Sequence, residues 1–293
     1  MHTDLADHFE AARSHLRSVA FHLLGSVDDA DDAVQGTWVK ASRADWRAIQ
    51  NLTGWLTTIT VHESIDQLRA RRRRNEVPLN HDGDPPAAAH ISWAPAAEEE
   101  VLRTDTVSRA LLVVLDRLSP AQRVAFVLHD VFAMPFDEIA VLLDRSPVAT
   151  KKLASRARHR LRADPDTEPT PNRGHLRVVE AFLAAVQGGD ISAMLELLAP
   201  DVVRRVDRIL VPDSVPAERR GRDDVAEESR AFIGRARSGA VVLVDGMPGI
   251  AIAPRGRLRA VLRIEVREDA LVHEIDIIGD PDRLDHLVLT LSA

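Results

Sequence analysis

Residues 136–162 read FDEIAVLLDRSPVATKKLASRARHRLR, and they predict the structure of the segment around them. The apolar residues of 136–143 predict a short amphipathic helix, and Asp144-Arg145 predicts a turn. Ser146-Pro147 supplies a helix cap and a proline suited to the first helical position, so a second helix should run to Arg162. A short helix, a tight turn and a basic helix together predict a helix-turn-helix, whose second helix lies in the major groove of DNA.

Positive charge is concentrated in this second helix. Residues 145–162 include seven Lys or Arg and no acidic residue, whereas residues 28–32 hold four aspartates. The net charge of −7 therefore averages over segments of opposite sign. We expect the core-facing residues of the basic helix to be Val148, Leu153, Ala157 and Leu161. The candidate DNA contacts are Ser146, Thr150, Lys151, Lys152, Ser155, Arg156, Arg158 and Arg162.

Length and composition limit the remaining possibilities. A chain of 293 residues with 45% apolar and 28% charged residues predicts a folded protein of two or three domains. The absence of cysteine excludes disulfides, iron–sulfur clusters and cysteine-ligated zinc. No signal peptide or membrane-length apolar run is apparent, so we expect a cytoplasmic protein. Proline-rich segments predict linkers at 77–97 and 164–174, which separate domains at 1–76, 98–163 and 175–293.

The first two domains are predicted to be all-helical. Apolar residues at three- and four-residue steps predict helices over 5–24, 52–73 and 101–118. Ser26 should cap a helix whose first turns carry the aspartates of 28–32, and Ser119-Pro120 should begin another.

The third domain is predicted to be α+β, with a curved antiparallel sheet. Two helices are expected over 176–188 and 191–198. Alternation of apolar and polar residues predicts a hairpin of strands 257–266 and 271–278. Further strands are expected over 201–206 and 240–244.

Three stretches resemble the extracytoplasmic-function (ECF) sigma factors of bacterial RNA polymerase. Residues 24–38 (LGSVDDADDAVQGTW) resemble their region-two helix, which binds the polymerase clamp. Residues 54–69, with GWLTTI and DQLR, resemble the helix that melts and reads the minus-ten element. Residues 118–130 (LSPAQRVAFVLHD) and SRAR at 155–158 resemble region four, which reads the minus-thirty-five element. The resemblance covers about the first 163 residues in the expected order.

The resemblance also implies site residues. The acidic helix should bind core polymerase through Asp28, Asp29, Asp31, Asp32, Gln35 and Trp38. The candidate minus-ten contacts, which would hold a flipped base or stack on single-stranded DNA, are Asn51, Thr57, Thr58, His62, Arg69 and Arg72.

The third domain resembles the SnoaL-like, NTF2-like cone that some of these factors carry as a C-terminal extension. The candidate regulatory residues are Asp280, Pro281, Asp282, Arg283 and Leu284. The chain departs from that subgroup at 207–212, where DRILVP replaces a glycine-rich stretch. An apolar stripe at Leu284, Leu287, Val288 and Leu291 predicts a helix that needs a docking partner, either the cone or the helical domains.

These features predict a sequence-specific transcription initiation factor whose C-terminal domain modulates its activity. The alternatives are a ligand-responsive helix-turn-helix regulator that acts without polymerase and an enzyme fused to a promoter-binding module. We expect no catalytic or metal-binding residue and no cofactor, because His129-Asp130, His273, Glu274, Asp276 and Glu265 form no pair whose spacing selects a reaction. The expected partners are core RNA polymerase and promoter DNA, without a membrane. We expect a free monomer and leave open a small ligand in the C-terminal domain.

Overall fold

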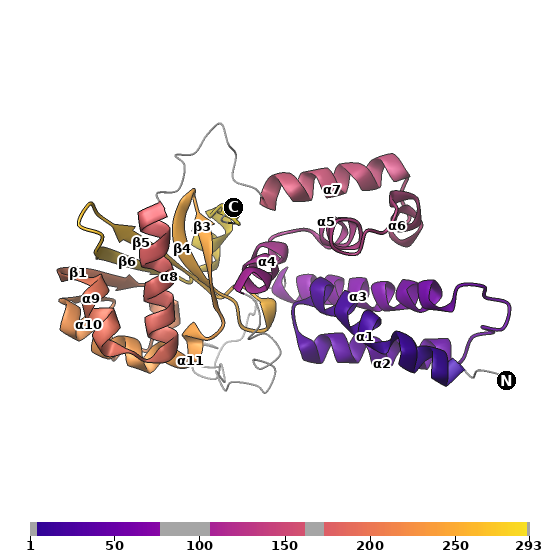
Figure 1. Ribbon diagram of the computed structural model, residues 1–293, viewed down its shortest axis with the longest axis horizontal. Coiled ribbons are helices and arrows are strands. Elements are labelled where there is room, and N and C mark those ends of the chain that lie inside the picture. The colour runs from indigo at the N-terminus through magenta and orange to yellow at the C-terminus, as the bar shows by residue number, and fades with distance from the viewer. Residues whose placement is uncertain (1–4, 77–105, 162–172, 292–293) are drawn as a thin grey trace. The chain divides into compact units, whose positions relative to one another are not determined.

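The structure, a computed structural model, describes residues 5–76, 106–161 and 173–291 (Figure 1). These residues form two compact units, which are described separately. The first unit contains residues 5–76 and 115–159, and the second contains residues 106–114, 160–161 and 173–291. The proposed linker 77–97 lies outside the described residues, and helix α8 begins at Arg173, inside the second proposed linker.

Three long helices begin the first unit: α1 (Leu5–Leu24), α2 (Val27–Ala41) and α3 (Leu52–Glu76). The apolar residues that predicted α1 are all buried, which confirms this helix. They are Leu5, Phe9, Ala12, Leu16, Val19, Ala20, Leu23 and Leu24. Ser26 caps α2 as predicted, accepting a hydrogen bond from the Asp29 amide. Phe9, Leu16 and Leu56 lie in the core that joins these helices.

The helix-turn-helix segment completes the first unit. Its elements are α5 (Pro120–Phe126), a π-helical turn η4 (Val127–Val131), α6 (Phe136–Leu143) and α7 (Pro147–Leu161). Ser119 and Gln122 form a reciprocal capping box at the start of α5. The ring of Phe132, just after η4, makes edge contacts with His15 and His22 of α1. The predicted helices are therefore present, but the π-helical turn was not predicted.

The C-terminus of α1 is the junction between the two helical groups of this unit. Gly25 has φ +76°, which suits glycine and ends the helix with its last carbonyls lacking helical partners. Arg123 of α5 donates to the Leu23 carbonyl (Nη1–O 2.9 Å), and Arg71 of α3 donates to the Leu24 carbonyl (Nη1–O 2.9 Å). Positive charge at a helix C-terminus interacts favourably with the negative end of the helix dipole. Two arginines from different helices therefore cap α1.

Each capping arginine has its own carboxylate. Asp116 binds Arg123 (Nη2–Oδ1 3.2 Å), and Asp29 binds Arg71. Arg123 is only 4% exposed, and burial lowers the pKa of its guanidinium, although Asp116 opposes the shift. A buried charge is costly without a partner, and Asp116 supplies one for Arg123. The hydrogen bond from this guanidinium to the Leu23 carbonyl then holds α5 against the end of α1.

The second unit contains α4 (Thr106–Asp116) as far as Val114 and an α+β domain. The helices of that domain are α8 (Arg173–Gly188), α9 (Ile191–Leu197), α10 (Arg222–Ser229), α11 (Ile233–Ala236) and α12 (Pro281–His286). The strands are β1 (Leu198–Val206), β2 (Glu218–Arg220), β3 (Gly239–Val244), β4 (Met247–Ile252), β5 (Ala260–Val266), β6 (Val272–Ile278) and β7 (Leu289–Thr290). Short 3-10 turns η5 (Arg208–Leu210), η6 (Arg230–Phe232) and η7 (Pro254–Gly256) connect them.

The strands form one sheet in the order β2-β1-β6-β5-β4-β3-β7, in which only the β1–β6 pair is parallel. Helices α8, α9 and α10 lie against the sheet (Figure 1). The core between them contains Phe182, Met194, Ile250, Ile264 and Ile275. Helical domains followed by an α+β domain confirm the predicted fold class, including the β5–β6 hairpin.

The C-terminal apolar stripe is not the continuous helix that we predicted. Helix α12 ends at His286, and β7 pairs antiparallel with β3 of the same domain. Leu284, Leu287 and Leu289 are buried, whereas Val288 is 55% exposed. The β3 edge offers unpaired backbone groups, which explains why this segment extends into a strand.

Replacing Arg123 with Ala should lower the free energy of unfolding by about 2–3 kcal/mol, because the Leu23 carbonyl and Asp116 lose a buried charged donor. Urea denaturation of the full chain measures this change. Arg13→Ala is the matched control, since the Arg13–Glu10 pair is exposed and worth about 0.5 kcal/mol or less. Equal losses in the two variants would contradict the assigned role of Arg123.

Candidate nucleic-acid and polymerase surfaces

Local geometry fixes the start of α7. Asp144 adopts the left-handed conformation (φ 50°) that ends α6. The Ser146 hydroxyl accepts a hydrogen bond from the Ala149 amide (3.2 Å), and Pro147 occupies the first turn of α7. The Thr150, Ala154, Ala157 and Leu161 side chains are buried along one side of the helix. The opposite side of α7 is therefore the exposed face.

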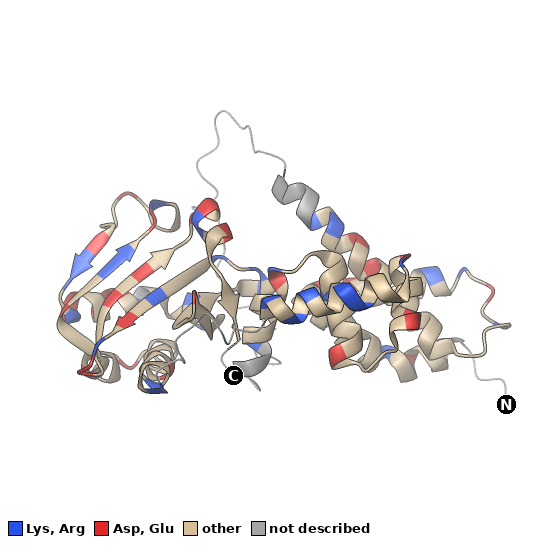
Figure 2. Ribbon diagram, turned by 90° about the horizontal axis from the view of Figure 1, so that it is seen from above, with Lys and Arg blue, Asp and Glu red and all other residues tan. Residues whose placement is uncertain are grey.

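Most of the predicted DNA contacts lie on exposed parts of this segment. Ser146, Lys151, Lys152, Ser155 and Arg156 are exposed. Figure 2 shows the Lys and Arg residues along α7. Arg162 lies outside the described residues.

Two of our predictions about α7 need correction. Thr150 is fully buried, and its hydroxyl donates to the Ser146 carbonyl (3.1 Å), so it is unavailable to DNA. Val148, which we placed in the core, is 67% exposed.

Arg158 is half-buried and bound within the first unit. Its guanidinium forms a bidentate pair with the Asp130 carboxylate (Nε–Oδ1 2.7 Å and Nη2–Oδ2 3.2 Å). The neighbouring His129 stacks on Phe136, with ring centroids 3.8 Å apart. The sequence did not identify this pair, because Asp130 lies 28 residues before Arg158. Arg158 can offer its whole guanidinium to DNA only if it leaves Asp130.

The predicted minus-ten residues lie directly before α3, at Asn51, and along α3, and they have different environments. Asn51, His62 and Arg69 are exposed, and the Asn51 side chain also accepts a hydrogen bond from the Gly54 amide (2.9 Å). Thr58 is half-buried and donates to the Gly54 carbonyl. The side chain of Arg72 lies outside the described part of the chain.

Thr57 is a further correction. It is 2% exposed, and its hydroxyl donates to the Thr53 carbonyl (2.8 Å). A threonine whose hydroxyl is satisfied by its own helix can be buried, so Thr57 does not belong to the surface set.

The acidic helix α2 has one exposed stripe. Asp28, Asp32, Gln35 and Val39 are exposed at three- and four-residue steps, which places them on one face. Val39, 45% exposed, was not among the predicted residues. We call these four residues the α2 stripe.

The other predicted residues of α2 have internal partners. Asp31 forms a bidentate pair with Arg17 of α1 (Nε–Oδ1 2.6 Å and Nη2–Oδ2 3.1 Å), and Asp29 binds Arg71. Trp38 is partly buried against Phe9, with ring centroids 5.0 Å apart.

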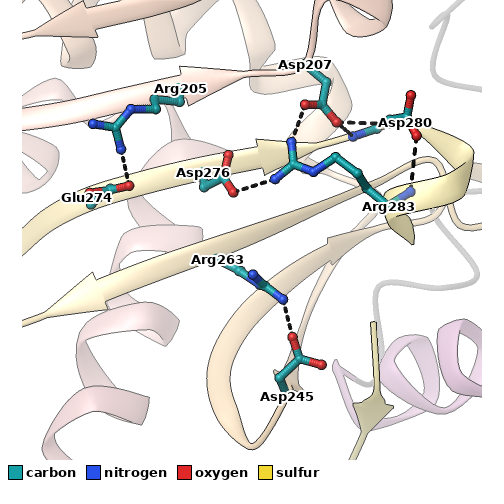
Figure 3. Close-up of polar contacts among 9 residues, drawn as sticks. Arg205, Asp207, Asp245, Arg263, Glu274, Asp276, Asp280 and Arg283 are labelled. Carbon is teal, nitrogen blue, oxygen red and sulfur yellow. Dashed lines mark hydrogen bonds and ion pairs between the residues drawn. The ribbon is translucent and has the colours of Figure 1, made fainter. Parts of the chain in front are cut away.

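The predicted regulatory segment is bound to its own domain (Figure 3). The Asp207 carboxylate, at the end of β1, accepts hydrogen bonds from the Gly279 and Asp280 amides (both 2.9 Å). Arg283 binds both Asp207 and Asp276 (Nη2–Oδ2 2.9 Å to Asp276). The 207–212 loop, where the chain departs from the SnoaL-like subgroup, therefore contacts the C-terminal motif.

The remaining residues of this segment build α12. Asp280 caps it by accepting from the Arg283 amide (3.1 Å), and Pro281 follows in the first turn. Asp282 is exposed and Leu284 is buried. Burial raises the pKa of Asp207, but the two amides and Arg283 outweigh it and leave that pKa below its usual value.

Charged side chains of the sheet are bound in ion pairs (Figure 3). Arg205 binds Glu274, and Arg263 binds Asp245, whose other oxygen accepts from the Val288 amide (2.9 Å). Glu265 binds Arg267 (2.8 Å).

A surface hollow of about 590 Å³ lies beside the β5–β6 turn, where His273 binds Asp269 (Nε2–Oδ2 2.9 Å). Among the described residues, no three His, Asp or Glu side chains are grouped as metal ligands would be.

Replacing Asp207 with Asn should destabilise the C-terminal domain by about 1–2 kcal/mol at pH 7, because the ion pair with Arg283 is lost. The lowered pKa means that the carboxylate stabilises the fold fully above its unfolded-state pKa of about 3.9. This contribution disappears as the pH falls through the folded-state pKa. Chemical denaturation at several pH values should therefore show the difference between the two proteins shrinking below pH 4. A constant difference down to pH 3 would contradict the assignment.

Family models match both helical segments. The model of sigma-70 region 2 matches residues 8–74, and the model of sigma-70 region 4 matches residues 108–161. The ECF RNA polymerase sigma factor SigJ of Mycobacterium tuberculosis is 35% identical, over 94% of this chain and 91% of the relative. The probable ECF RNA polymerase sigma factor SigI of the same species is 30% identical, over 100% of this chain and 99% of the relative.

Solved structures also match. The crystal structure of SigJ from Mycobacterium tuberculosis has 32% identity and a TM-score of 0.44, covering 95% of this chain and 98% of that chain. A SnoaL-like protein of unknown function from Burkholderia thailandensis has 18% identity and a TM-score of 0.29, covering 38% of this chain and 98% of that chain.

None of the described helices is long and apolar enough to span a membrane. With a relative that is 35% identical across nearly its whole length, the chain belongs to the family of ECF RNA polymerase sigma factors.

Proposed function

We propose that three surfaces of this transcription initiation factor bind three different targets. The α2 stripe binds core RNA polymerase, the exposed residues of α3 contact the minus-ten element, and the exposed face of α7 reads the minus-thirty-five element. The observation that carries this proposal is the separation of charge. The exposed face of α2 has Asp28 and Asp32, whereas that of α7 has Lys151, Lys152 and Arg156. The acidic face of α2 suits a protein partner, whereas the basic face of α7 suits a polyanion such as DNA.

The DNA-contacting set is narrower than the sequence suggested. On α7 we retain Ser146, Lys151, Lys152, Ser155 and Arg156, which are exposed. Arg158 joins them if it exchanges Asp130 for a phosphate or a base, since guanidinium binds both in the same bidentate way. For the minus-ten contact we retain the exposed residues Asn51, directly before α3, and His62 and Arg69 of α3, together with the half-buried Thr58.

The C-terminal domain is proposed to modulate initiation without catalysing a reaction. Glu265, Glu274 and Asp276 are each bound to an arginine, so none is available as a free general base. Apolar side chains fill the space between its sheet and helices, which argues against a small-ligand pocket there. The factor would act in the cytoplasm, as a monomer until it binds polymerase.

Helix α4 supports the modulating role. It begins the region-four segment, yet as far as Val114 it lies in the same compact unit as the C-terminal domain. The Arg109 guanidinium of α4 donates to the Arg237 carbonyl (2.7 Å), just after α11. We propose that this contact restrains region four until polymerase binds.

Replacing Asp32 with Ala should weaken binding to core polymerase by about fivefold or more, since the interface loses an exposed carboxylate. Asp31→Ala is the matched control, because Asp31 is already paired with Arg17, and its effect should be smaller. Fluorescence titration of labelled protein with core polymerase measures both. Unchanged affinity of Asp32→Ala would contradict the assignment of α2.

Replacing Arg109 with Ala should raise the number of transcripts per polymerase-bound molecule about two- to fivefold, because one restraining hydrogen bond is lost. The measurement is single-round transcription with saturating core polymerase. Arg230→Ala, which removes an exposed pair with Glu227, is the control. If Arg109→Ala leaves transcription unchanged, the contact has no regulatory role.

A further inference from the structure

Val148 is an apolar side chain in a polar surrounding. It occupies the first turn of α7, directly after Pro147, and is 67% exposed. Valine is a poorer helix former than alanine, so the helix itself does not favour it here. The capped, fixed geometry at Ser146 holds the Val148 side chain in a defined place on the surface.

The helical geometry places Val148 on the face opposite the core. Successive residues are rotated by about 100°, so buried Thr150, Ala154, Ala157 and Leu161 lie about 180–240° from Val148. Lys152, Ser155 and His159 lie within about 40° of it and are exposed. Val148 therefore lies at the N-terminal end of a line that runs along the outermost face of α7.

This position is where a recognition helix meets base edges. In helix-turn-helix proteins the N-terminal residues of the second helix contact bases in the major groove. Among the groups that base pairs present there, the C5-methyl of thymine is the apolar one, and small apolar side chains contact it. The flanking lysines supply the charge that brings this face to a phosphate backbone.

We propose that Val148 determines specificity in the minus-thirty-five element by contacting the methyl group of one thymine. This inference rests on the proposed function of α7 and adds one residue and one base to it. The contact removes two exposed apolar groups from water, whereas lysine and serine neighbours read polar edges and phosphates.

The test uses the full chain bound to core polymerase. The first step selects binding sites from random double-stranded DNA. Failure to enrich any sequence would overturn the proposed DNA-binding function itself, and an enriched element without thymine would overturn only the role of Val148.

The second step replaces each thymine of the selected element, one at a time, with deoxyuridine, which lacks only the methyl group. One replacement should weaken binding by the wild-type protein about fourfold, as expected for the loss of one buried methyl group. Val148→Ala should weaken binding to the thymine form by a similar factor and should make that replacement neutral.

Val141→Ala is the matched control, because Val141 is 80% exposed but lies on α6, the helix that does not enter the groove. Its ratio of thymine to deoxyuridine affinities should equal that of the wild type. If every deoxyuridine replacement has the same effect in Val148→Ala and the wild type, the proposal is wrong. A loss of core-polymerase affinity in Val148→Ala, without any change in the thymine ratio, would assign Val148 to polymerase instead.

Discussion

The capped C-terminus of α1 is the constraint on which the first unit depends. Glycine at position 25 stops the helix, and its last carbonyls must then find donors. Arg71 and Arg123 provide them from α3 and α5, and each brings a carboxylate partner from its surroundings. Helices that are far apart in sequence thereby meet at one point. The placement of α5 in turn fixes the π-helical turn, α6 and α7, which follow it without long connections.

Much of this fold could be predicted because its signals are local. Three serines, Ser26, Ser119 and Ser146, are followed by residues that favour the start of a helix. All three cap helices in the structure. The β5–β6 hairpin was predicted from alternation, which is also local. The β3–β4 hairpin was not predicted, because Pro248 and Gly249 of β4 are residue types that disfavour a central strand.

The sites were less predictable because side-chain partners are not local. Asp31 finds Arg17 fourteen residues away, and Arg158 finds Asp130 across 28 residues. Thr57 and Thr150 look polar in sequence, yet each satisfies its hydroxyl within its own helix and becomes a core residue. For α7 the apolar residues that mark the core face are mostly alanines, which identify a face weakly. We therefore placed Val148 on the core face and Thr150 on the exposed face, and the structure reverses both.

The pairing of β1 with β6 has a consequence for the order in which the molecule is made. β1 ends at Val206, whereas its parallel partner β6 begins at Val272. The hydrogen bonds of Asp207 to the amides of Gly279 and Asp280 likewise form only after those residues have been synthesised. A ribosome that adds about 5–20 residues per second needs roughly 4–15 s to cross that interval. The helices of the first unit precede it entirely. In each newly made molecule, synthesis of the first unit's helices is therefore finished some seconds before the domain that follows them can complete its sheet.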